Sequence, residues 1–251
     1  MSTATLEKVP VTEDATPEAI PARDDSRQRA LIPPQALARV RAVVIGTGAV
    51  GRQVVLQLAS IGVPAITIYD HDTVGPENLA PQGFLELDLG KTKVEAVKEM
   101  AKLMNPTCDI RPRPNRFRVS DVPSWDPGEE DHAHIDTVVF LCVDSMEARS
   151  LIWGAVKTHS FIKAVFDSRS ASEMIRVFAV DKPTEDTYYD TTLFTDEQAH
   201  TGDCSTRMTI YMSYVASGMM LCQFAHWLRK MTVVPDQSFN MLAGELTVPE
   251  E

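Results

Sequence analysis

The stretch Ala-Val-Val-Ile-Gly-Thr-Gly-Ala-Val-Gly at residues 42–51 decides the fold of this chain. Its first four residues are apolar and mostly β-branched, which indicates a short buried strand. Gly46, Gly48 and Gly51 follow with the spacing GxGxxG, and residues 50–61 carry apolar side chains at helical intervals. The pattern predicts a strand, a glycine turn and a helix, whose N-terminal N–H groups can bind a phosphate.

A second apolar run, residues 65–69, ends at Asp70 and completes a strand–helix–strand crossover. Such crossovers are right-handed and join parallel strands. A carboxylate about twenty residues after the glycines is the group expected to accept hydrogen bonds from ribose hydroxyls. To this point an NAD-dependent dehydrogenase and an ATP-using enzyme fit the residues equally.

Periodicity predicts the remaining elements. We expect further strands at residues 109–117, 137–143, 162–166 and 173–180, and helices at residues 92–104, 146–158 and 205–230. The tight connection before the strand at 173–180 indicates antiparallel pairing there. The predicted fold is therefore α/β: a Rossmann-like, mainly parallel sheet flanked by helices, with an antiparallel C-terminal extension.

Composition limits the environment of the protein. The 24 Lys and Arg against 35 Asp and Glu leave a net charge of −11, which disfavours binding to nucleic acid or to an anionic membrane. The four cysteines form no CxxC pair and no apolar run is long enough to span a bilayer, so we expect reduced thiols and a cytoplasmic location. Residues 1–24 lack hydrophobic periodicity and are expected to be a disordered tail before one domain at 25–251.

The residues after Asp70 distinguish an ATP-using enzyme from an NAD-dependent dehydrogenase. They run Asp-His-Asp-Thr-Val-Gly-Pro-Glu-Asn-Leu-Ala-Pro-Gln at 70–82, and continue as Gly-Lys-Thr-Lys-Val-Glu-Ala at 90–96. This resembles the ThiF/MoeB family of ubiquitin-activating-enzyme-like adenylating proteins, whose pattern is DxDxVxxSNLxRQ followed by GxxKVxA. Residues 26–28 and 143–145 are similar to two further elements of that family, SRQ and TDN.

The resemblance implies a role for several residues in ATP binding. The glycine loop and Asp70 would hold ATP, with Asn78 and Gln82 lining the phosphate site. Lys93 would contact the phosphate and the transition state, although the neighbouring Lys91 is an alternative.

The resemblance also implies a metal and a second subunit. Asp144 would position Mg²⁺ near the triphosphate. Its place before a helix also fits an N-cap, and the two roles are compatible. Asp72 would ligate a metal or cap its own loop. Arg27 would reach into the site of a neighbouring subunit, which implies a homodimer, unless it is an ordinary linker arginine.

Two departures from the family pattern stand out. Pro81 occupies the place of the arginine in NLxRQ, so one phosphate-binding cation is missing, for which Arg52, Lys91 or Arg149 could compensate. Residues 188–194 contain no cysteine where many relatives carry zinc-binding CxxC pairs, so we expect no zinc.

The predicted activity is ATP-dependent adenylation of the C-terminal carboxylate of a ubiquitin-like or sulfur-carrier protein, by an adenylation domain at residues 25–251. Cys204 precedes the last helix and is either a thiol nucleophile that accepts the activated acyl group or a small buried side chain. Alternatives are adenylation of a peptide, a tRNA-attached group or a small acid, and a degenerate nucleotide-binding scaffold subunit, which Pro81 would favour.

Overall fold

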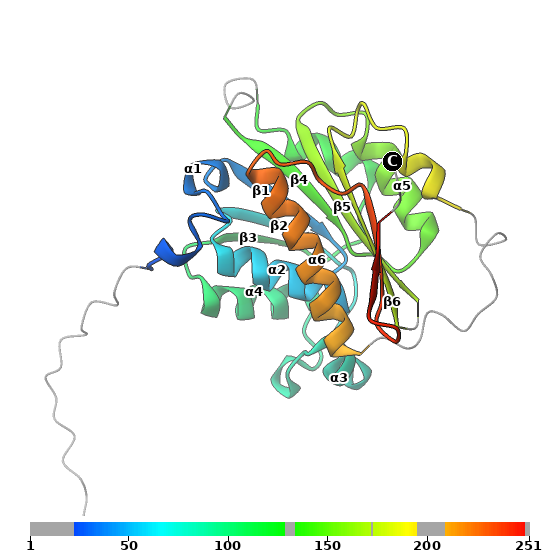
Figure 1. Cartoon of the computed structure of the whole chain (residues 1–251). Helices are drawn as coiled ribbons and strands as arrows, with labels where there is room; N and C mark the ends of the chain where they lie inside the picture. Colours follow the sequence, from blue (N-terminus) through cyan, green and yellow to red (C-terminus); the bar gives the residue numbers. More distant parts are fainter. Residues whose placement is uncertain (1–22, 129–133, 172, 195–208, 249–251) are drawn as a thin grey trace, which may run out of the picture.

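The computed structural model describes residues 23–128, 134–171, 173–194 and 209–248. These residues build one eight-stranded sheet with the order β3-β2-β1-β4-β5-β6-β7-β8 (Figure 1). The strands are β1 Val40–Ile45, β2 Ala65–Tyr69, β3 Asp109–Arg113, β4 Asp136–Leu141, β5 Ile162–Ala171, β6 Met174–Asp181, β7 Asp236–Asn240 and β8 Glu245–Thr247. Pairing is parallel from β3 through β5 and antiparallel from β5 to β8, so the predicted fold class is confirmed.

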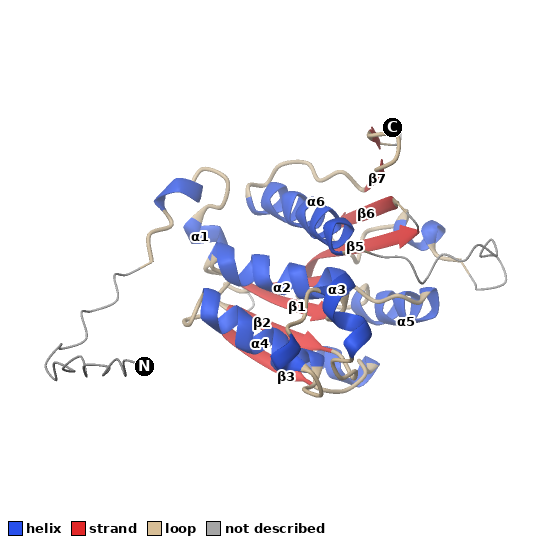
Figure 2. Cartoon of the chain, turned by 90° about the horizontal axis from the view of Figure 1, so that it is seen from below, coloured by secondary structure: helices blue, strands red, loops and turns tan. Residues whose placement is uncertain are grey.

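Helices cover both faces of the sheet. The helices are α1 Pro34–Leu37, α2 Ala49–Ile61, α3 Leu79–Gln82, α4 Lys93–Met104, α5 Met146–Val156 and α6 Ile210–Leu228. Short 3-10 turns lie at Ser26–Gln28, Pro76–Asn78, Glu86–Asp88, Val119–Trp125 and Tyr189–Thr192. On one face α2 lies between α4 and α6 (Figure 2), and on the other α5 packs with the turn at Val119–Trp125.

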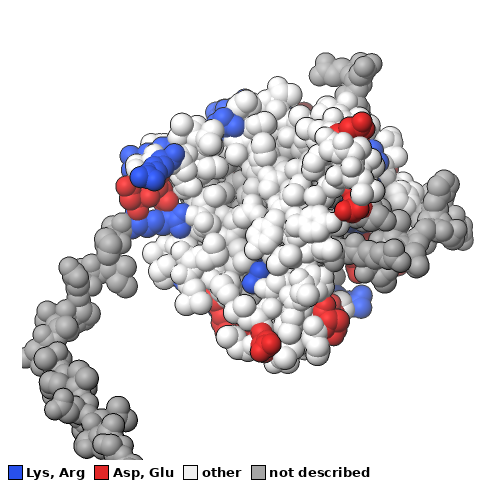
Figure 3. All heavy atoms as spheres, turned by 60° about the horizontal axis from the view of Figure 1, so that its bottom comes forward, with Lys and Arg blue, Asp and Glu red and all other residues white. Residues whose placement is uncertain are grey.

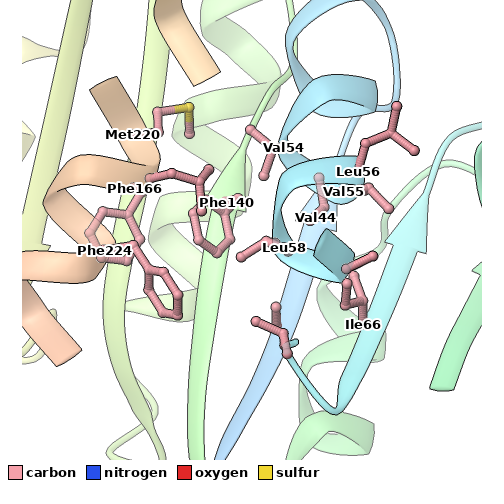
Figure 4. Packing of buried hydrophobic residues seen from close by; sticks show 14 of the residues in the cluster. Val44, Val54, Val55, Leu56, Leu58, Ile66, Phe140, Phe166, Met220 and Phe224 are labelled. Carbon is pink, nitrogen blue, oxygen red and sulfur yellow. The ribbon is translucent and has the colours of Figure 1, made fainter. Parts of the chain in front are cut away.

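Alternation along the central strands supplies both halves of the core. Val44 faces the layer of α2, α4 and α6, whereas Val43 and Ile45 face the layer of α5. On the α6 side, the Phe224 ring contacts Phe140 of β4 and Phe166 of β5, with ring centroids 5.7 and 5.9 Å apart (Figure 4). The rings cover the α6 face of these two strands, which pair from Thr137 and Ile162 to Leu141 and Asp167.

The structure corrects several predicted boundaries. The strand expected at 109–117 ends at Arg113, because its neighbour β2 ends at Tyr69, which is paired with Arg113. Strands β7 and β8 were not predicted, since they are short and largely polar. The helix α6 begins at Ile210 within the described residues, and the predicted tail and Cys204 lie outside them, apart from residues 23 and 24. No helix among the described residues is long and apolar enough to cross a membrane.

Candidate functional site

A cavity of about 1200 Å³ opens at the carboxyl ends of the parallel strands. It lies where β1 stands between β2 and β4, the place at which chain connections diverge and where open α/β sheets bind ligands. The residues predicted for the site that line this cavity are Gly46, Gly48, Asp70, Asp72, Gln82, Lys93 and Asp144.

Two glycines of the loop are required by close backbone contacts. Gly46 has a φ of +89°, and a Cβ on it would lie 2.5 Å from the carbonyl oxygen of Cys142. A Cβ on Gly51 would lie 1.8 Å from the carbonyl oxygen of Gly46. The loop therefore turns tightly against β4, and Gly48 at the N-cap of α2 faces the cavity with the helix N-terminus behind it.

Asp70 holds the glycine loop against the end of β2. Its Oδ2 accepts hydrogen bonds from Thr47 N at 2.7 Å and Thr47 Oγ1 at 3.1 Å, and its Oδ1 accepts one from Asp72 N at 3.0 Å. A carboxylate offers about four acceptor positions, so these three bonds leave room for a ribose hydroxyl. Contact with the ribose stays a prediction.

Lys93 is the lysine that reaches the cavity. It is 6% exposed at the start of α4, and its Nζ lies 2.8 Å from Asp72 Oδ2. The hydrogen bond from Lys93, with the charges of Lys93, His71 and Arg116, holds the pKa of Asp72 below its ordinary value. Lys91 instead pairs with Asp88 and Glu99 and does not line the cavity. Asp72 is thus the ion-pair partner of Lys93.

Gln82 presents an unsatisfied polar group beside the glycine loop. Its Oε1 is the one buried side-chain nitrogen or oxygen among the described residues that lacks a hydrogen-bond partner. A Cβ built on Gly48 would lie 3.8 Å from this oxygen. Buried polar groups are normally hydrogen-bonded, so this unpartnered amide oxygen can accept a hydrogen bond from a ligand.

Asp144 lies on the opposite side of the cavity, after β4. The side chain of Ser145, not that of Asp144, caps α5 by accepting from Ala148 N at 3.1 Å, so the alternative that Asp144 caps the helix is wrong. Asp144 and Glu147 both line the cavity, and neither carboxylate has a partner among the described residues. Oxygen ligands of this kind together with a triphosphate suit Mg²⁺.

Two predicted residues, Arg27 and Asn78, lie away from the cavity, and a third, Cys204, is not among the described residues. Arg27 is exposed beside Gln28, whose Nε2 donates to Ile61 O at the last residue of α2, about 20 Å from the glycine loop by helix length. Asn78 is 8% exposed, accepts from Gly75 N at 2.9 Å and does not line the cavity. Within one chain Arg27 is too far away to reach the cavity.

The sequence did not reveal a buried charge cluster behind the cavity. Asp167 is fully buried and accepts from Arg149 Nε at 3.0 Å, Arg169 Nε at 2.8 Å and Tyr189 OH at 2.8 Å. Burial by itself would raise the pKa of Asp167, but the charges of Arg149 and Arg169 outweigh it and lower that pKa. The residues lie on β5, α5 and the turn after β6, so no local motif joins them.

The close contact at Gly51 leads to a prediction. Gly51→Ala is expected to abolish measurable ATP binding and to destabilise the fold, because the new methyl group would overlap the Gly46 carbonyl. Calorimetric titration with ATP and urea unfolding would measure the two effects. Gly154→Ala is the matched control: its site is exposed and open, and alanine is expected to stabilise α5 by about 0.5–1 kcal/mol without changing ATP affinity. Normal ATP affinity in Gly51→Ala would contradict the proposed role of the loop.

Sequence comparison places the chain among known relatives. The tRNA threonylcarbamoyladenosine dehydratase of Haemophilus influenzae is 38% identical over 84 residues, which cover 32% of this chain and 32% of that protein. The molybdopterin-synthase adenylyltransferase of Salmonella typhimurium is 29% identical over 117 residues, covering 46% and 44% of the two chains. The matches therefore span less than half of each of these two relatives.

Structural comparison finds the same fold. The E. coli MccB structure with ATP matches with a TM-score of 0.65 and 15% identity, over 86% of this chain and 64% of that one. The profile of the ThiF family matches residues 26–242, which include every described residue that lines the cavity. By the extent of that match, the chain belongs to the ThiF family.

Proposed function

We propose that this protein adenylates the C-terminal carboxylate of a small ubiquitin-like or sulfur-carrier protein with ATP. The observation that carries the proposal is the meeting of the glycine loop, Gln82, Lys93 and Asp144 around one cavity, although they come from separate parts of the chain. The glycine loop alone suits any dinucleotide. The addition of a buried lysine and an unpaired carboxylate suits a reaction at a phosphate.

The proposed reaction is a substitution at the α-phosphorus of ATP. A carboxylate oxygen of the acceptor forms a bond to that phosphorus, the bond to the bridging β-phosphate oxygen breaks, and pyrophosphate leaves with the electron pair. The product is an acyl-adenylate. The N–H groups at the start of α2 and the ammonium of Lys93 would stabilise the negative charge that develops on the phosphate oxygens.

Mg²⁺ fits the same arrangement. Asp144 would hold the ion, and Glu147, three residues later in the chain, lines the same part of the cavity. When bound, the metal would neutralise triphosphate charge and orient the leaving pyrophosphate. Lys93 would still contact the phosphate when the metal is bound, because Lys93 and its partner Asp72 lie after β2, on the side of the cavity opposite Asp144.

The outer part of the cavity suits an extended protein tail. Leu151, Met174 and Phe194 line it and are 52%, 41% and 42% exposed. Apolar side chains exposed around a cavity commonly mark a binding surface. The tail of the acceptor would enter there, beside the loop that begins near Asp186, and transfer of the acyl group to Cys204 would follow as a thioester with release of AMP.

A homodimer would supply Arg27 to the site of the partner. Two observations support a homodimer. Arg27 is far from the cavity of its own chain, and one face of the molecule carries few charged side chains (Figure 3). The helix α6 contains no Asp, Glu, Lys or Arg in 19 residues, and its Tyr211 and Tyr214 are 46% and 52% exposed. In a chain with a net charge of −11, such a helix suits burial against a second copy.

Complementation tests action in trans. Arg27→Ala and Lys93→Ala are each expected to be nearly inactive, whereas their co-expressed mixture is expected to recover about a quarter of the wild-type rate. Half of the dimers would be mixed, and each mixed dimer would have one site with both residues intact. ATP–pyrophosphate exchange measures the recovery, and separately expressed, unmixed variants are the control. A mixture no more active than the single variants would show that Arg27 does not act in trans.

The activity itself is tested by ATP–pyrophosphate exchange with candidate acceptors, chiefly small proteins encoded near this gene. Exchange that requires one acceptor with a free C-terminus would support the proposal, and blocking that carboxylate as an amide should abolish it. ATP binding without exchange for any acceptor would instead support the degenerate scaffold.

Adenylation of a peptide carboxylate is the second candidate. It is favoured by the fold shared with MccB, which has been crystallised with MccA and with ATP. The same exchange assay distinguishes the two: short C-terminal peptides would then replace whole proteins without loss of rate.

A further inference from the structure

Arg116 lines the cavity, although it belongs to none of the motifs found in the sequence. We propose that Arg116 binds the phosphate chain of the nucleotide and so replaces the arginine that Pro81 displaces. The inference rests on the proposed function, in that the cavity must hold a nucleotide.

Two of the substitutes expected from the sequence do not reach the cavity. Arg52 is 5% exposed, its guanidinium lies 5.4 Å from the centroid of the Phe84 ring, and it does not line the cavity. Lys91 precedes α4, is held by Asp88 and Glu99 at 3.3 and 2.6 Å, and does not line the cavity. Neither side chain is placed to meet a phosphate.

The third substitute, Arg149, lines the cavity but is fully engaged. Its Nε donates to Asp167, and its two terminal nitrogens donate to the carbonyl oxygens of Val143, Ser145 and Ser168. Turning it toward a ligand would strip the buried Asp167 of a partner, which is costly. Arg149 therefore contributes to the structure of the cavity wall, and its guanidinium is not available to bind phosphate.

Two further arginines of the cavity wall are also paired. Arg169 donates to Asp167 and Thr192, with its guanidinium 4.1 Å from the Phe178 ring centroid. Arg176 makes two hydrogen bonds to Asp236. Among the described cavity-lining Lys and Arg side chains, Arg116 alone has no hydrogen bond or ion pair.

The strand register brings Arg116 to the side of the cavity where Asp72 and Lys93 lie. Strands β2 and β3 are parallel, with Tyr69 opposite Arg113, and Asp70 N donates to Arg113 O at 3.3 Å. Three residues past that pair, Arg116 comes beside Asp72, and its charge helps to lower the pKa of Asp72. Since Asp72 also holds Lys93, the two cations belong to one group around this carboxylate.

The backbone around Arg116 is anchored while its guanidinium is free. Asn115 Nδ2 donates to Arg116 O at 2.8 Å, and the Phe117 ring packs against Trp125 with centroids 5.6 Å apart. An arginine held in this way loses little backbone freedom on binding. Its planar guanidinium matches two phosphate oxygens at once, which makes arginine well suited to this task.

Calorimetric titration with a nucleotide series tests the assignment. Wild-type protein, Arg116→Ala and Arg116→Lys are titrated with Mg-ATP, AMP and adenosine. Arg116→Ala is expected to bind Mg-ATP about tenfold to a hundredfold more weakly with unchanged affinity for adenosine, as loss of a charged hydrogen bond implies. Arg116→Lys should recover part of the loss, because it keeps the charge but not the bidentate geometry.

Arg118→Ala is the matched control, since Arg118 is exposed two residues further on and does not line the cavity. Its ATP affinity should equal that of the wild type, and thermal melting should show both arginine variants folded. Unchanged ATP affinity in Arg116→Ala would overturn the inference and leave the proposed function intact. Equal losses for ATP and adenosine would overturn it too, by assigning Arg116 to the nucleoside. If the wild type binds no ATP, both the inference and the proposed function fail.

Discussion

Replacement of Lys93 by alanine is expected to lower the rate of ATP–pyrophosphate exchange by about 10²–10³-fold, the usual cost of removing one group that stabilises transition-state charge. Lys93 is nearly buried, and its ammonium meets only Asp72 among the described side chains. In such a site a fixed charge is worth more than in water, because little solvent screens it. The loss should therefore appear in kcat as well as in the KM for ATP.

Lys91→Ala is the control for Lys93→Ala. Lys91 stands two residues away and its ammonium pairs on the surface of α4, so exchange should stay within about twofold of the wild type. Comparable losses in the two variants would mean that the local fold, not the Lys93 charge, sets the rate. An unaffected Lys93→Ala variant would remove Lys93 from the proposed mechanism.

Asp167→Asn is expected to lower the free energy of unfolding by about 3–5 kcal/mol, the usual cost of breaking a buried ion pair. The substitution keeps the shape of the side chain but removes the charge, so Arg149 and Arg169 would both remain in the interior without a counter-ion. Urea unfolding at pH 7 measures the change. Asp109→Asn, in an exposed pair with Arg111, should change stability by less than about 1 kcal/mol.

The pH dependence of the free energy of unfolding tests whether the lost charge of Asp167 causes the destabilisation of Asp167→Asn. The pKa of Asp167 is lower in the folded protein than in the unfolded chain, so the unfolded state binds its proton first as the pH falls. The stability that Asp167 contributes is therefore complete above pH ~4 and is lost as the pH falls toward the folded pKa. The difference between wild type and Asp167→Asn should shrink over that acidic range. A difference independent of pH would show that the charge is not its source.

Local patterns predicted the parts of the site that depend on backbone geometry. The glycine spacing anticipated a tight turn between a strand and a helix, and the apolar runs anticipated the parallel strands on either side. The structure adds that Gly46 and Gly51 tolerate no Cβ in this turn. The family resemblance assigned the phosphate contact to Lys93 with Lys91 as an alternative, and the structure brings Lys93 but not Lys91 to the cavity. Asp144 lines the cavity, and Ser145 rather than Asp144 caps the helix.

The remaining features depend on contacts between distant segments. Arg116 follows a short edge strand and belongs to no motif, and only the pairing of β2 with β3 puts it beside Asp72. The partners of Asp167 come from three separate elements, so their charges balance only after the sheet and α5 have packed.

The amino-acid sequence by itself determined the α/β fold class, the glycine loop and membership of the predicted family, because these follow from residue types at short spacings. The tertiary structure alone decided which cationic side chains face the cavity unpaired and which are held in ion pairs and hydrogen bonds of its wall. The physical reason is that a charged side chain acts through its distance to other charges, and that distance is set by strand register and packing.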